Sequence, residues 1–137
     1  ETNVPREVTT DDYCHMLTKF TSGASGVFTI SKCCIGRKNY QRIQIYGSKG
    51  AVIYTLKDKD LQDTIEVCIG NPYTESYNFT HLDIPAEYTA EQMQSFFDIL
   101  NECGDGMAAN LTDGLKAQKL ITKVMESAET HQWVTVG

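Results

Sequence analysis

The sequence has no long apolar run, and this absence limits what the protein can be. Of its 137 residues, 41% are hydrophobic and 22% are charged, which is typical of a globular protein. No stretch approaches the roughly 18 consecutive apolar residues that suggest a membrane-spanning helix. We therefore predict one globular domain over residues 1–137, with no membrane as partner.

Basic residues are scarce, with 12 Lys and Arg against 18 Asp and Glu and a formal net charge of -6. Nucleic acids and anionic membranes attract basic surfaces, so we predict that the chain binds no nucleic acid. Arg37, Lys38 and Arg42 form a local basic cluster. This cluster is either a solvated loop and strand surface or a site for an anionic or hydroxylated ligand.

The five cysteines lack the paired spacings of a zinc site or a thioredoxin-like redox motif. They are Cys14, Cys33, Cys34, Cys68 and Cys103. Their odd number does not support a disulfide framework. We predict buried, reduced thiols in a cytoplasmic protein and no metal site.

Nucleotide-binding and nucleophile motifs are also missing. There is no Gly-x-Gly-x-x-Gly and no Gly-x-Ser-x-Gly, and the residues 47–50 (GSKG) fit a hairpin turn better than a phosphate loop. His15, His81 and His131 lie far apart in the sequence, without the i, i+4 spacing that suits a metal. We predict that each histidine is structural or on the surface.

What is present is a strand-like first two-thirds followed by a helical last third, a segregation that predicts the α+β class. β-branched and aromatic residues between turn signals predict strands. These strands span about 13–20, 25–35, 40–46, 51–56, 64–69 and 77–84. The connections are short, which favours antiparallel pairing in one large sheet.

Two helices are predicted after Pro85. Residues 89–92 (TAEQ) have the form of a capping box, and Met93, Phe96, Phe97 and Leu100 follow a helical apolar spacing that predicts packing on the sheet. A second helix is expected to begin with Thr112 or Asp113 as its cap. Its apolar spacing predicts burial of Ala117, Leu120, Ile121, Val124 and Ala128. Residues 133–136 then form a closing strand or an extended tail.

Two helices can cover only one face of a wide sheet, yet some strands are apolar on both faces. Apolar or aromatic side chains occupy both faces of the predicted strands at residues 51–54 (AVIY) and 27–30 (VFTI). This is the pattern of strands buried on two sides. An uncovered apolar face usually marks association. We therefore expect a homo-oligomer through the open face of the sheet, or else cover from a further domain.

Two stretches carry a family resemblance. Residues 45–52 (IYGSKGAV) and 113–136 (DGLKAQKLITKVMESAETHQWVTV) resemble the C-terminal domain of the Gfo/Idh/MocA oxidoreductases, which are related to glucose-fructose oxidoreductase and inositol dehydrogenase. The resemblance covers nearly the whole chain. It implies a large, mainly antiparallel, open-faced sheet with two helices on one face, like the C-terminal domains of dihydrodipicolinate reductase and glyceraldehyde-3-phosphate dehydrogenase.

The resemblance also implies what lies outside the chain. Members of this family bind NAD or NADP in an N-terminal Rossmann domain, and this chain begins at Glu1 rather than at Met. We therefore expect a piece of a longer protein, with no cofactor bound by this chain and no catalysis by it alone. The family's Glu-Lys-Pro motif is absent, and no catalytic role is assigned to Asp11, Asp12 or His15.

This chain is still expected to contribute residues that bind the substrate. In the family, the end of the second long strand and the loop after it approach the sugar. By motif register, the candidate substrate-binding residues here are Lys32, Cys34, Arg37, Lys38, Asn39 and Tyr40. Arg, Lys and Asn side chains can hydrogen-bond a polyol.

The basic residues in this loop leave the substrate open among a sugar or polyol, a keto acid, a sugar phosphate and a nucleotide sugar. The expected function is the substrate-binding and oligomerisation domain of an NAD(P)-dependent dehydrogenase, and the alternative is a non-catalytic ligand-binding or assembly module.

Overall fold

The computed structural model describes residues 5, 7–56, 63–70, 73, 78–85, 88 and 92–137. It divides into two compact units. One comprises Glu1–Cys14 with Thr29–Thr89, and the other comprises His15–Phe28 with Ala90–Gly137. That the chain forms one domain stays a prediction, and each unit is described by itself.

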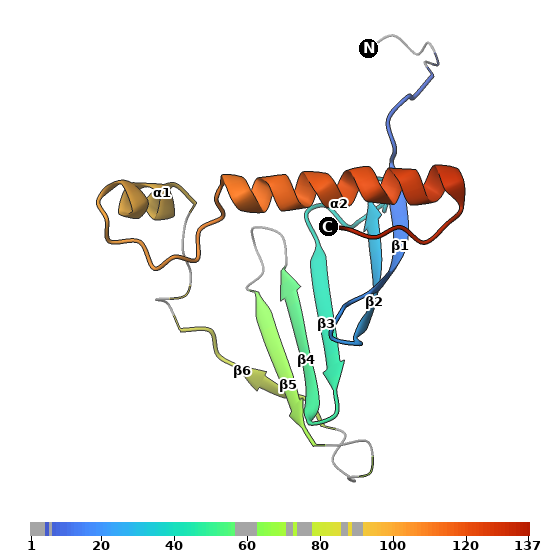
Figure 1. Ribbon diagram of the computed structural model, residues 1–137. Coiled ribbons are helices and arrows are strands. Elements are labelled where there is room, and N and C mark those ends of the chain that lie inside the picture. The colour runs from blue at the N-terminus through green and yellow to red at the C-terminus, as the bar shows by residue number, and fades with distance from the viewer. Residues whose placement is uncertain are drawn as a thin grey trace. The chain divides into compact units, whose positions relative to one another are not determined.

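The described elements confirm the α+β class (Figure 1). The strands are β1 (Tyr13–Lys19), β2 (Ser25–Ser31), β3 (Gln41–Gly47), β4 (Gly50–Leu56), β5 (Thr64–Ile69) and β6 (Thr80–Leu82), and the helices are α1 (Gln92–Leu100) and α2 (Leu111–Thr130). β3, β4, β5 and β6 pair in sequence order as an antiparallel sheet. β1 and β2 form a separate two-stranded sheet, so the described strands make two sheets where the sequence predicted one.

The strand bounds agree with the prediction to within one residue except in β2 and β6. β2 stops at Ser31 rather than at residue 35, because the Ser31 hydroxyl accepts a hydrogen bond from the Cys33 backbone N–H at 3.2 Å. A side chain that bonds nearby backbone in this way competes with strand pairing. Among the described residues β6 spans only Thr80–Leu82, and residue 77 of the prediction lies outside them.

The register of the sheet sorts its side chains onto two different faces, because residues opposite each other in an antiparallel pair share a face. Ile45 faces Val52, and Val52 faces Val67. The same register gathers nine apolar or aromatic residues on this side, which we call the apolar face. Its members are Ile43, Ile45, Val52, Tyr54, Leu56, Ile65, Val67, Ile69 and Leu82.

The opposite side, which we call the mixed face, carries polar side chains around a small buried centre. Ile53 lies between Gln44 and Glu66 and is 7% exposed. Thr55 beside it is also buried. By contrast, Val52 of β4 on the apolar face is 38% exposed, so β4 is not buried on both sides as predicted.

Burial elsewhere is lower than the sequence predicted. In β2, Val27, Phe28 and Ile30 are exposed, and so are the four apolar residues of the α1 stripe. In α2, Leu120 and Val124 are half-buried, whereas Ala117, Ile121 and Ala128 are exposed. Amphipathic spacing identified these helices but did not give the depth of their burial, since depth depends on what covers the stripe.

The cysteines are also more exposed than the sequence predicted. Cys33, Cys34 and Cys103 are exposed, and Cys14 and Cys68 are half-buried, all as free thiols. Cys33 and Cys34 follow the end of β2 instead of continuing it, and the Cys33 Sγ lies 3.2 Å from the Ser31 Oγ.

The cap of α2 is Asn110 rather than Thr112 or Asp113. The Asn110 Oδ1 accepts hydrogen bonds from the backbone N–H groups of Thr112 and Asp113, at 2.8 and 3.2 Å. Asp113 Oδ2 in return accepts the Asn110 backbone N–H at 3.1 Å. This reciprocal capping box satisfies amide groups that lack partners inside the helix, and residues 133–136 follow α2 as a tail without strand pairing.

The turn between β3 and β4 requires glycine at one position. Gly47 faces Gly50 across a two-residue connection, and Gly50 has a φ of 150°. A Cβ atom on Gly50 would overlap the Cys68 carbonyl oxygen, which belongs to the backbone of β5. Because backbone cannot move aside as a flexible side chain can, this close approach depends on glycine.

Replacing Gly50 by Ala is expected to lower the free energy of unfolding by about 1–3 kcal/mol, since it combines an unfavourable φ with a steric overlap. The matched control is Gly47→Ala, whose Cβ would lie an ordinary 3.7 Å from the Gly50 carbonyl oxygen. Chemical denaturation of the complete protein measures the free energy of unfolding of both variants. Equal stabilities for the two variants would contradict the role given to Gly50.

Candidate substrate-binding site

The candidate site is the loop 32–40 between β2 and β3, which three backbone features hold in place. The Lys32 backbone N–H donates to the Asp12 carbonyl at 2.8 Å, which ties the start of the loop to the segment before β1. The Arg37 N–H donates to the Cys34 carbonyl at 3.1 Å and closes a turn. Gly36 inside this turn has a φ of 81°, a conformation that glycine adopts without steric cost.

Arg37 and Tyr40 are brought together at the end of the loop. The Arg37 guanidinium carbon lies 4.4 Å from the centre of the Tyr40 ring. This distance is within the range of a cation–π interaction. The stack restricts the long Arg37 side chain while Tyr40, the half-buried member, leads into β3.

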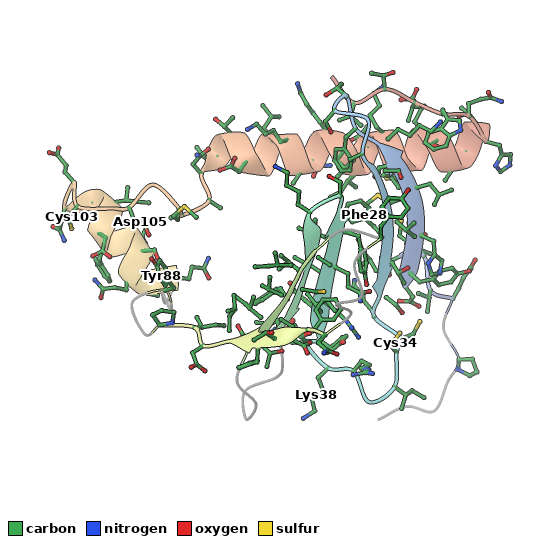
Figure 2. All side chains as sticks on the ribbon, turned by 90° about the horizontal axis from the view of Figure 1, so that it is seen from below. Phe28, Cys34, Lys38, Tyr88, Cys103 and Asp105 are labelled. Carbon is green, nitrogen blue, oxygen red and sulfur yellow. The ribbon has the colours of Figure 1, made fainter. Side chains whose placement is uncertain are left out.

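The remaining predicted site residues share the loop. Lys32, Cys34, Lys38 and Asn39 are exposed, and Figure 2 shows Lys38 projecting from the loop that also carries Cys34. The Cys34 side chain is a free thiol, while its carbonyl contributes to the turn. The stack therefore joins two of the six predicted residues through their side chains, and a role in binding substrate stays a prediction for all six.

The polar side chains of the loop are suited to hydrogen bonding. Its polar side chains are mainly hydrogen-bond donors, namely the guanidinium of Arg37, the ammonium groups of Lys32 and Lys38 and the amide of Asn39. Residues 32–40 contain no carboxylate and no imidazole. Donors of this kind can hydrogen-bond hydroxyl, carboxylate or phosphate oxygens.

The described part of the chain offers no metal site: no three His, Cys, Asp or Glu side chains in it lie close enough to hold an ion. Likewise, none of the described helices is both long enough and apolar enough to cross a bilayer.

Sequence reasoning missed one polar pair on the sheet. The Tyr54 hydroxyl donates a hydrogen bond to Asp63 Oδ2 at 2.9 Å. Desolvation, this hydrogen bond and the negative charge of Asp63 together raise the pKa of Tyr54 above its ordinary value. The pairing of Thr55 with Thr64 places Asp63 on the same face as Tyr54 and diagonal to it, which only the register of the sheet could show.

The Tyr54–Asp63 pair predicts a loss of stability at alkaline pH. Because folding raises the pKa of Tyr54, its contribution is fully present below the unfolded-state value of about 10 and is lost as the pH rises through the folded-state value. Denaturation midpoints across this range should fall more steeply for the native protein than for Tyr54→Phe. Identical pH profiles for the two proteins would show that the pair contributes nothing.

Comparison with known proteins assigns the family. A family model described as the oxidoreductase family, C-terminal alpha/beta domain (Gfo/Idh/MocA) matches residues 1–136. The chain therefore belongs to the Gfo/Idh/MocA oxidoreductase family and is a C-terminal domain of it, as the two motif stretches predicted.

One curated relative is a levoglucosan dehydrogenase from Pseudarthrobacter phenanthrenivorans. It is 22% identical to this chain over 148 aligned positions, which cover 94% of this chain and 37% of the relative. The chain thus spans little more than a third of that enzyme's length. No solved structure matches the chain significantly.

Proposed function

We propose that this chain is the substrate-binding and oligomerisation domain of an NAD(P)-dependent oxidoreductase acting on a sugar, a polyol or a related hydroxy compound. Membership of an oxidoreductase family supports the reaction class. A relative that is a sugar dehydrogenase by name supports the substrate class. The observation that carries the substrate-binding role is the ordered donor loop, in which Arg37 is stacked on Tyr40.

In this proposal the reaction is shared between two domains. The nicotinamide cofactor, NAD or NADP, accepts hydride and is held by an N-terminal Rossmann domain of the complete protein. This chain has no Gly-x-Gly-x-x-Gly fingerprint, the loop with which such domains bind the pyrophosphate. The loop 32–40 orients the substrate hydroxyl groups, and the chain is inactive by itself.

The complete protein is expected to reduce NAD or NADP with at least one member of a panel of sugars, inositols and other polyols. This chain alone should bind neither nucleotide in calorimetry. The reaction is followed by the absorbance of the reduced nicotinamide, with cofactor alone and substrate alone as blanks. Micromolar binding of NAD by this chain would contradict the claim that the cofactor is bound by the other domain. If the complete protein binds a sugar without transferring hydride, the alternative of a non-catalytic binding module is favoured.

The proposed oligomer forms through the apolar face of the four-stranded sheet. Five of the nine residues on this face are exposed, namely Ile43, Ile45, Val52, Ile69 and Leu82. Exposed apolar residues that lie singly need no explanation, but a continuous patch on one sheet face marks an association surface. A second copy, presenting the same face, would bury this patch in a homodimer or larger symmetric assembly.

Neighbouring residues of β3 give a matched test of this interface. Ile45 lies on the apolar face and Gln44 on the mixed face, and both are exposed. Ile45→Glu should dissociate the assembly, since a carboxylate would be buried against apolar side chains, while Gln44→Glu should leave it intact. Light scattering gives the mass, and circular dichroism checks that each variant remains folded.

Two outcomes would overturn the interface. If the native protein is monomeric at all concentrations, the proposed interface does not exist. If Ile45→Glu unfolds without giving a folded monomer, this face is covered within one chain.

We also propose a cytoplasmic location. The five cysteines are free thiols, which suits a reducing compartment.

A further inference from the structure

The basic residues of this acidic protein are concentrated around the candidate site. Lys32, Arg37, Lys38 and Arg42 lie within 11 consecutive residues that include no Asp or Glu. The other eight Lys and Arg share the rest of the chain with all 18 acidic residues. The segment 32–42 therefore has a local formal charge of +4 in a chain whose net charge is -6.

Within the described residues, no carboxylate forms an ion pair with Lys32, Arg37 or Arg42. The described pairs lie instead on α2, where Lys116 is 3.7 Å from Asp113 and Lys123 is 2.6 Å from Glu126. Basic side chains that share one loop and the strand after it raise the local concentration of anions. The local charge thus favours a negatively charged ligand over a neutral one.

The stack of Arg37 on Tyr40 leaves the guanidinium able to bind such a ligand. The guanidinium carbon lies over the Tyr40 ring, 4.4 Å from its centre, and the N–H donors of a guanidinium point outward in its own plane. Those donors match the two oxygens of a carboxylate or phosphate in a bidentate pair. Holding Arg37 against the ring also reduces the conformational entropy that binding would otherwise cost.

We propose that the substrate is an anionic sugar, one that carries a carboxylate or a phosphate group, and that Arg37 binds this group. Lys32, Lys38 and Arg42 add to the local positive charge, and Tyr40 is a positioning residue for Arg37. This inference rests on the proposed function, because it gives the substrate class of the same loop.

Calorimetry on the complete protein tests the inference without requiring turnover. The probes are uronates and sugar phosphates, each compared with its neutral parent sugar. At least one acid should bind about tenfold or more tightly than its parent, and Arg37→Gln should remove that advantage by weakening the acid about tenfold more than the neutral parent. Lys116→Gln removes the same charge on α2 and should change neither. Added salt should weaken binding of the acid selectively, because the site is exposed.

Substitutions of Tyr40 separate positioning from a merely structural role. Tyr40→Phe keeps the aromatic ring and should retain the preference for the acid. Tyr40→Leu keeps an apolar side chain without the ring, and should weaken the acid severalfold more than the neutral sugar. Equal effects of the two variants on the acid would remove the positioning role.

The outcomes distinguish this inference from the proposed function. If no acid binds more tightly than its parent, or if Arg37→Gln weakens NADP binding instead of acid binding, the anionic substrate is overturned, whether or not a neutral sugar is oxidised. If the acid binds through Arg37 but no hydride is transferred, the inference holds and the dehydrogenase proposal fails.

Discussion

The pairing of β4 along both of its edges is the interaction on which the described sheet depends. β3 and β5 both pair with β4 along nearly its whole length, and the buried residues Ile53 and Thr55 belong to it. The close approach of β5 to the β3–β4 turn is possible because position 50 is glycine. Since β3 is fixed by this pairing, the end of the loop 32–40 that leads into β3 is fixed as well.

That anchoring supports the proposed role of an exposed loop in substrate recognition. Loops carry function when a regular scaffold holds their ends. Here one end is held by the bond between Lys32 and Asp12 and the other by β3. The turn at Gly36 and the stack of Arg37 on Tyr40 then order the intervening residues. In the proposed function, the site is a set of hydrogen-bond donors on the loop between β2 and β3, and the reacting groups belong to the domain that binds the cofactor.

The elements and the family could be read from the sequence, whereas burial and some local bonds could not. Alternation of apolar residues and glycine turns gave the strands because these signals are local. The end of β2 was misplaced because a single hydroxyl, that of Ser31, diverts the backbone. The cap of α2 fell on Asn110 rather than on its equally suitable neighbours. Which sheet face is apolar required the register, and the stack of Arg37 on Tyr40 required side-chain geometry.

Hydrogen–deuterium exchange of the complete protein, with cofactor present and with or without saturating substrate, tests the central claim most directly. Slower exchange on adding substrate is expected in residues 32–42, where the donors of the loop would close on the ligand, with β4 unchanged because it is already paired on both sides. Turnover of substrate with no change of exchange in residues 32–42 would contradict the assignment of this loop as the substrate-binding site.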